Sequence, residues 1–268
     1  MVERASFWHS GIPDCASAMV SWIEGEDQRP LPGLHGTGFF VRRGNAIAFV
    51  TSRHCLGPLE NDYDEVVKRL AIPYHGVKRK STGPMLSRDW VRFDSYAIPK
   101  VSWNTDEFFS GGDLDLAVLK VSTADDRATR RLLSRAAKLP PTGDWFATAF
   151  RVNGGRFPGN TIVQGFPRNG TETSIDYDTA NVIVEGATFR GTVTGRGDYP
   201  HTWRIEFQQE HARLTDLDGV SGSPVFLQWR NKYGMMAALA GVMIRGTFPV
   251  GQFIDVSWYV DALSQLGV

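Results

Sequence analysis

The stretch Asp218-Gly219-Val220-Ser221-Gly222-Ser223-Pro224-Val225-Phe226 decides the fold that this sequence predicts. Glycine stands on either side of Val220-Ser221, and glycine lets the backbone turn sharply. Such a turn exposes the hydroxyl of Ser221 and lets nearby backbone N–H groups converge on an oxyanion. The apolar residues after Pro224 predict that the turn leads into a strand over Val225 to Trp229.

Two earlier segments carry residues that can activate a serine hydroxyl. His54 follows the predicted strand Ala46 to Thr51 by one short turn, which holds an imidazole at the edge of a rigid sheet. Asp115 opens the predicted strand Leu116 to Val121 and therefore lies next to the core. A buried acid needs a hydrogen-bond partner, and an imidazole N–H is a suitable one. A serine nucleophile needs both a base that removes its proton and an acid that orients the base.

The order His54, Asp115, Ser221, with these flanking residues, resembles the trypsin/chymotrypsin-like serine peptidases, in particular the intracellular or bacterial trypsin-like type. The resemblance implies an all-β fold of two antiparallel six-stranded β-barrels (chymotrypsin-like), with the active site in the cleft between them. The intervals of 61 and 106 residues between these three positions suit two compact barrels. Four further segments match the family: Gly36-Thr37-Gly38-Phe39, Gly165-Phe166-Pro167, Gly191-Thr192-Val193 and Ala240-Gly241-Val242.

The residues alone leave two choices open, because Ser223 competes with Ser221 and Asp113 competes with Asp115. In the family the nucleophile lies between two glycines and two positions before a small residue that precedes proline, which selects Ser221. The family's acid directly precedes an apolar-Ala-apolar run, which selects Asp115. The resemblance also implies that the backbone N–H groups of Gly219 and Ser221 form the oxyanion hole.

The resemblance further indicates where a substrate would bind. Thr215 takes the position of the pocket floor and lies beside Asp216, which could attract a cation. The segment Ile244-Arg245-Gly246 resembles the edge strand that pairs with an extended substrate, and Arg245 could attract an acid. Asp216 and Arg245 have opposite charges, so they do not decide whether a basic or an acidic substrate side chain is preferred.

Val220 departs from the secreted members of the family, which have an aspartate immediately before the nucleophile. In those members the aspartate pairs with a new N-terminal ammonium after the precursor is cut. Valine cannot form this ion pair, so such activation cannot operate here. We expect the loop around Ser221 either to be held by packing or to be rearranged by a partner that shifts its population.

The predicted strands fall into two groups separated by a helix. Thr123 to Leu139 carries Ala, Arg and Leu at helical spacing and ends at Pro140-Pro141, so we expect a linker helix. The boundary then divides the chain into residues 1–138, an N-terminal barrel that carries the histidine and the acid, and residues 139–268, a C-terminal barrel that carries the serine.

A terminal helix is expected over Ser257 to Leu266, where apolar residues recur at helical spacing. Between Gly57 and Trp103 the alternation of apolar residues is lost, which favours long surface loops with short strands. The remaining expected strands are Ala18 to Ile23, Gly38 to Arg42, Thr161 to Gly165, Val182 to Glu185, Thr202 to Phe207 and Met236 to Ile244.

The net charge and the number of cysteines limit which partners and which cellular compartment are expected. Lys plus Arg equals Asp plus Glu at 29 each, so no net field attracts nucleic acid or a membrane surface. No stretch approaches the roughly 18 apolar residues that span a bilayer. Two cysteines, Cys15 and Cys55, are too few for a disulfide framework, so we expect free thiols and a cytoplasmic location.

No metal or other cofactor is expected. Four histidines lie in polar segments without the spacing of metal ligands, so we expect solvated side chains. They are His35, His75, His201 and His211.

The expected activity is that of a serine endopeptidase, which hydrolyses peptide bonds through a Ser-His-Asp triad and an acyl-enzyme intermediate. Its partners would be a protein or peptide substrate and a regulatory protein, because a broadly active cytoplasmic peptidase would be harmful. Two alternatives are a catalytically silent binding module of the same fold and a peptidase that processes only its own precursor. Cleavage of a separate substrate molecule distinguishes the three.

Overall fold

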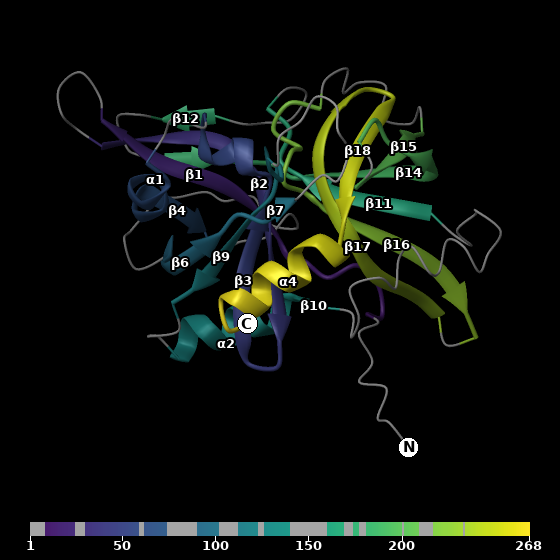
Figure 1. Ribbon diagram of the computed structural model, residues 1–268, viewed down its shortest axis with the longest axis horizontal. Coiled ribbons are helices and arrows are strands. Elements are labelled where there is room, and N and C mark those ends of the chain that lie inside the picture. The colour runs from purple at the N-terminus through teal and green to yellow at the C-terminus, as the bar shows by residue number, and fades with distance from the viewer. Residues whose placement is uncertain are drawn as a thin grey trace.

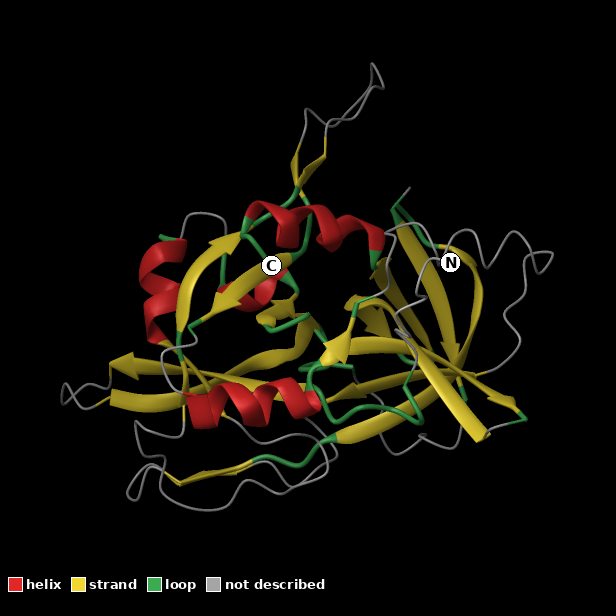
Figure 2. Ribbon diagram, turned by 90° about the horizontal axis from the view of Figure 1, so that it is seen from below, coloured by secondary structure: helices red, strands yellow, loops and turns green. Residues whose placement is uncertain are grey.

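The structure is a computed structural model and describes residues 9–24, 30–58, 62–73, 90–101, 112–122, 126–139, 160–168, 174–176, 181–199, 201–208, 217–232 and 234–268. These residues are mostly in β-strands, and the few helices lie at the periphery (Figure 2). Most strands belong either to one large sheet or to one closed barrel, which lie side by side (Figure 1).

The N-terminal half forms an eight-stranded sheet in the order β5-β4-β1-β2-β3-β9-β6, with β10 paired to β2. Its two edge strands, β5 and β6, are separated in sequence by Arg92 alone, so one short segment pairs with opposite ends of the sheet. The sheet therefore curves until its edges meet at this corner. Its strands are β1 (Ala16–Glu24), β2 (Pro30–Arg43), β3 (Ala46–Thr51), β4 (Leu70–Pro73), β5 (Trp90–Val91), β6 (Phe93–Ala97), β9 (Ala117–Val121) and β10 (Ala137–Lys138).

The C-terminal half forms a closed six-stranded barrel in the order β11-β14-β15-β18-β17-β16. In β14 the buried residues Phe189, Gly191 and Val193 alternate with exposed ones, as expected for a strand with one face on the core. The barrel strands are β11 (Asn160–Gly165), β14 (Ala187–Arg196), β15 (Thr202–Phe207), β16 (Pro224–Asn231), β17 (Gly234–Thr247) and β18 (Val250–Asp255). Two small two-stranded sheets pair β7 (Lys100–Val101) with β8 (Gly112–Asp113) and β12 (Ser174–Asp176) with β13 (Asn181–Ile183).

The helices are short, and one of them begins at a side-chain cap. The Asp62 side chain accepts a hydrogen bond from the Asp64 N–H and so caps α1. None of the described helices is long and apolar enough to cross a membrane. The helices are the 3₁₀ turn η1 (Arg53–Leu56), α1 (Tyr63–Arg69), α2 (Asp126–Arg135) and α4 (Ser257–Gln265).

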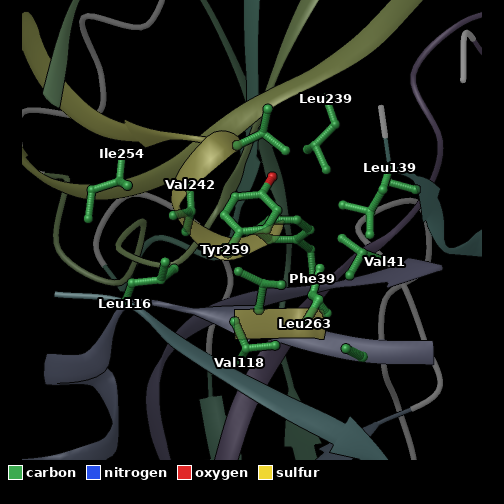
Figure 3. Close-up of a cluster of buried hydrophobic side chains, with 14 of the residues drawn as sticks. Phe39, Val41, Leu116, Val118, Leu139, Leu239, Val242, Ile254, Tyr259 and Leu263 are labelled. Carbon is green, nitrogen blue, oxygen red and sulfur yellow. The ribbon is translucent and has the colours of Figure 1, made fainter. Parts of the chain in front are cut away.

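One hydrophobic cluster joins the sheet, the barrel and α4. Figure 3 shows Tyr259 of α4 in the middle of this cluster, with Phe39 and Val118 on the sheet side and Leu239 and Val242 on the barrel side. All five side chains are fully buried. This shared core fixes the half that carries His54 and Asp115 relative to the half that carries Ser221.

Most of the expected elements are present, with small differences in their ends. The expected linker helix is shorter than predicted, because α2 ends at Arg135 and the chain then forms β10. The terminal helix is confirmed as α4, whereas the strand expected over Val182 to Glu185 ends at Ile183. Two barrel strands, the ten-residue β14 and the six-residue β18, were not predicted because glycines interrupt their apolar alternation.

Candidate active site

The pairing of β3 with β9 explains why His54 and Asp115 meet. The two strands are antiparallel, and Thr51 at the end of β3 lies opposite Ala117 at the start of β9. His54 comes just after β3, in η1, and Asp115 comes just before β9. Both residues therefore emerge at the same end of the same strand pair.

His54 and Asp115 are joined by two hydrogen bonds. The His54 Nδ1 atom lies 2.7 Å from Asp115 Oδ2, and the His54 backbone N–H donates to Asp115 Oδ1 at 2.9 Å. Because the carboxylate accepts from Nδ1, the opposite ring nitrogen, Nε2, is left for proton exchange. The His54 side chain is 45% exposed, so this exchange is open to solvent or to a substrate.

The same contact changes the protonation of the ring. The hydrogen bond to Asp115, and next the contact with Cys55, raise the pKa of His54 to about 10, against the opposing effect of burial. A raised pKa extends the range of pH over which the ring holds its second proton.

Ser221 lies in a tight turn, residues 218–222, that leads into β16. Gly219 and Gly222 have φ values of 84° and 85°, a region that other residues rarely adopt. A Cβ at Gly222 would lie 1.8 Å from the Thr37 carbonyl oxygen, and one at Gly219 would lie 2.5 Å from the Phe166 carbonyl oxygen. Only glycine fits at either position, as the sharp turn requires.

Thr37 of β2 holds this loop in place. Its hydroxyl donates to the Gly219 carbonyl at 2.7 Å and accepts from the Phe166 N–H at 2.9 Å. Its backbone N–H donates to the Ser221 carbonyl at 3.0 Å. A strand of the N-terminal sheet thus holds, by hydrogen bonds, a loop that belongs to the C-terminal barrel.

Two N–H groups of the loop are available to a ligand. The Val220 N–H donates to the Leu217 carbonyl at 3.0 Å, and the Ser223 N–H donates to the Val220 carbonyl at 3.0 Å. The N–H groups of Gly219 and Ser221 have no acceptor within the described part of the chain. These are the two donors that the sequence predicts for an oxyanion hole.

The hydroxyl of Ser221 does not bond to His54 in the described contacts. It donates instead to the Ile244 carbonyl at 3.1 Å. The Ile244 carbonyl therefore accepts the hydroxyl proton in this arrangement, and the hydroxyl must rotate before it can donate to His54.

The alternative residues left open by the sequence occupy different surroundings. Ser223 is fully buried, and its Oγ atom lies 2.2 Å from where a Cβ at Gly165 would stand. Ser221 is partly exposed. Asp113 lies in β8 opposite Lys100, whereas Asp115 bonds to the imidazole. The surroundings therefore favour Ser221 and Asp115.

The predicted substrate edge is at the end of β17. A β-bulge between Met243 and Arg245 takes Ile244 out of the ladder with β18, which leaves its carbonyl facing Ser221. The strand β16 pairs with β17 only as far as Val242, so no described strand covers the other side of Ile244 to Gly246. An extended chain could pair there.

Arg245 lines a cavity of about 320 Å³ with Gly246, Thr247, Val250 and Gln252. Its guanidinium lies 3.3 Å from the Asp198 carboxylate and 4.6 Å from the centre of the Tyr199 ring. The charge of Arg245 is therefore already partnered. Thr215 and Asp216, the predicted pocket floor, lie outside the described residues, as do His75 and His211.

The environment of His201 differs from the expectation. Its side chain is only 8% exposed, stacks on Tyr199 and meets the Trp258 ring edge-on. Burial lowers its pKa. The prediction of a solvated side chain was wrong in part because Trp258, which also contacts His201, comes from α4 and could not be read from the local sequence.

Cys15 and Cys55 are both free, as expected from the sequence, and both are buried. The Cys55 thiol donates to the Ser221 carbonyl at 3.6 Å, so it borders the proposed nucleophile loop. Gly36 lies opposite this thiol, because a Cβ at Gly36 would stand 2.8 Å from Cys55 Sγ. Nothing in the sequence around Cys55 indicates that it borders this loop, and only the glycines that flank Thr37 indicate a constrained position there.

Comparison with known proteins gives little direct guidance. No family model and no curated protein matches the chain. Among solved structures, a similar chain comes from a study described as "Aromatic interactions drive the coupled folding and binding of the intrinsically disordered Sesbania mosaic virus VPg protein". It has 10% sequence identity over 97% of this chain and 96% of that chain, with a TM-score of 0.41. We draw nothing about activity from a similarity of this size.

Proposed function

We propose that the protein is a serine endopeptidase with His54 as base, Asp115 as orienting acid and Ser221 as nucleophile. The observation that carries the proposal is the 2.7 Å contact between His54 Nδ1 and Asp115 Oδ2, beside a constrained loop in which Ser221 is partly exposed. The two unpaired N–H groups of that loop support it further.

The corresponding fold is the chymotrypsin-like pair of β-barrels. The closed barrel β11-β14-β15-β18-β17-β16 supports the C-terminal member of the pair. The edges of the N-terminal sheet, which meet at Arg92, support a second barrel that is nearly closed. The residues of the proposed triad come from both halves, as an active site between two barrels requires.

In the proposed reaction, Ser221 Oγ attacks the substrate carbonyl carbon while His54 Nε2 takes the hydroxyl proton. The negative charge on the former carbonyl oxygen is stabilised by the N–H groups of Gly219 and Ser221. Collapse of this intermediate breaks the C–N bond, and His54 returns the proton to the leaving amine. Water then attacks the acyl-enzyme by the same steps and regenerates the Ser221 hydroxyl.

Substrate binding would also release the nucleophile. In the free protein the Ser221 hydroxyl donates a hydrogen bond to the Ile244 carbonyl at 3.1 Å. An extended substrate that pairs with the open edge of β17 would bring a backbone N–H to that carbonyl. The hydroxyl would then be free to turn toward the imidazole.

The alternatives are a silent binding module and a peptidase that processes only its own precursor. The contact between His54 and Asp115 favours a catalytic site over a silent one, because a binding module has no need of an oriented imidazole. The expectation that a partner rearranges the loop is weakened by the bonds from Thr37 to Gly219 and Ser221. Regulation by a protein and a cytoplasmic location remain predictions, the latter supported by two free thiols.

Labelling with a fluorophosphonate tests the proposal, with the modified residue identified by mass spectrometry. We expect labelling of the wild type and of Ser223→Ala, and none of Ser221→Ala. Wild-type protein that takes up no probe at any pH between 7 and 10 would refute an assembled nucleophile. If the wild-type protein takes up the probe, its cleavage of a peptide library would then exclude strict self-processing.

A further inference from the structure

Arg168, which follows β11, makes three hydrogen bonds near the proposed oxyanion hole. Its backbone N–H donates to the Asp218 carbonyl at 2.9 Å. Its guanidinium bonds the Asp218 carboxylate at 3.2 Å through Nη1 and the Leu34 carbonyl at 2.9 Å through Nη2. The arginine therefore links β11, β2 and the loop that carries Ser221.

The first of these bonds fixes the direction of a predicted oxyanion donor. The Asp218 carbonyl and the Gly219 N–H belong to one planar trans peptide, so the two groups point in opposite directions. While Arg168 holds the carbonyl, the Gly219 N–H must face the other way. Rotation of this peptide would turn the N–H away and put a carbonyl oxygen in its place.

The other peptides of the loop are held by different residues. Thr37 binds the carbonyls of Gly219 and Ser221, and the Met243 carbonyl accepts from the Gly222 N–H at 2.7 Å. The carbonyl of the peptide between Asp218 and Gly219 is held instead by the backbone N–H of Arg168, while the Arg168 guanidinium holds the Asp218 side chain. Val220 is fully buried and apolar, so it supplies no ion pair of its own to this loop.

We propose that Arg168 is a positioning residue that orients the Gly219 N–H for catalysis, with its guanidinium anchoring Asp218 so that the peptide cannot turn. This role rests on the proposed peptidase function. It gives the loop an ordering contact that needs neither cleavage of the chain nor a partner protein.

The exposure of this ion pair separates a positioning role from a structural one. The side chains of Arg168 and Asp218 are 43% and 50% exposed. An ion pair this open to water contributes little to folding stability. Its loss should therefore reduce the rate of the reaction while the melting temperature stays almost unchanged.

Arg43 supplies a matched control. Its guanidinium also binds a backbone carbonyl, that of Val268 at 3.1 Å, and a side-chain oxygen, that of Ser264 at 3.3 Å. Among the described residues, its side-chain hydrogen bonds go to α4 and the last residue of the chain and not to the loop that carries Ser221. Arg43→Ala removes the same kind of interaction at a distance from the proposed site.

The test compares fluorophosphonate labelling rates and peptide kcat and KM for wild type, Arg168→Ala, Arg168→Lys, Asp218→Asn and Arg43→Ala. We expect Arg168→Ala and Asp218→Asn to lower kcat and the labelling rate about 10- to 100-fold with KM nearly unchanged, since loss of one whole oxyanion donor costs about 100- to 1000-fold. Arg168→Lys should recover part of the rate, and Arg43→Ala should match wild type.

Two results separate the proposals. Absence of Ser221-dependent labelling in wild type and Arg43→Ala would refute the peptidase function itself. Normal labelling of Arg168→Ala and Asp218→Asn, with wild type active, would overturn only the role of Arg168. If Arg168→Ala does not fold, Asp218→Asn and Arg168→Lys still decide, because both keep side chains of similar size.

Discussion

The hydroxyl of Thr37 donates to the carbonyl of Gly219 at 2.7 Å across 182 residues of sequence. This bond connects the sheet that carries His54 to the loop that carries Ser221. The position of His54 relative to Ser221 therefore depends on Thr37, which is not one of the three proposed catalytic residues.

Thr37→Val keeps the shape of this side chain and removes its hydroxyl. The Gly219 carbonyl and the Phe166 N–H then lose their partner in a buried site, which costs about 1–3 kcal/mol for each group. We expect a lower free energy of unfolding in urea together with at least a tenfold lower fluorophosphonate labelling rate. Thr37→Ser retains the hydroxyl and serves as control, so equal losses in the two variants would contradict the assignment.

The activity should rise with pH well beyond neutrality. His54 acts as a base only when neutral, and its pKa is raised to about 10 by the hydrogen bond to Asp115 and the contact with Cys55. We expect kcat/KM to increase with pH toward that value, and Asp115→Asn to move the midpoint to lower pH while reducing the maximum. A plateau of the wild-type profile by pH 7 would show that the ring titrates normally.

Folding stability should fall between pH 6.5 and pH 4 because of His9. Its Nε2 atom accepts from the Lys138 N–H at 3.0 Å, and burial, followed by the charges of Lys138 and Arg42, lowers its pKa from 6.5 to about 4. The unfolded chain binds the proton first, so stability present above pH 6.5 is lost as the pH falls toward 4. Urea unfolding of wild type and His9→Gln across this range measures the effect, which should be smaller in the variant.

Tyr259→Phe should stabilise the fold by about 1 kcal/mol, because the buried Tyr259 hydroxyl has no hydrogen-bond partner in the described part of the chain. The ring itself remains in the shared core, where it packs at an angle of 75° on Phe39. Thermal unfolding provides the measurement, with Tyr259→Leu as a control that loses the ring and should be destabilised. A lower melting temperature for Tyr259→Phe would indicate that water or another group satisfies the hydroxyl.

The sequence predicted the elements with a strong local signal. The apolar run of β3 and the glycines around Ser221 each leave a recognisable pattern within ten residues. The same holds for the amphipathic α4. The strand β14 escaped prediction because Gly191 and Gly195 weaken its pattern, although its buried residues do alternate. The helix α1 lies in a segment that was assigned to loops.

The contacts of the candidate site could be predicted only in part. His54, Asp115 and Ser221 stand out because their flanking residues resemble a family pattern. Thr37 and Arg168 act through bonds to residues 182 and 50 positions away, and nothing in their neighbourhoods indicates those partners. Long-range pairing of this kind follows from how the strands assemble, which no local pattern encodes.

The free thiol beside the nucleophile loop also has a consequence for engineering. A Cβ at Gly36 would stand 3.6 Å from the Cβ of Cys55, within the separation of about 3.5–4.5 Å that bridged cysteines adopt. Gly36 has a φ of 156°, however, a region that other residues rarely adopt, so Gly36→Cys would reach Cys55 only with strain in the backbone of β2. In the native chain the Cys55 thiol is free and donates to the Ser221 carbonyl, so β2 meets this turn at Gly36 through packing.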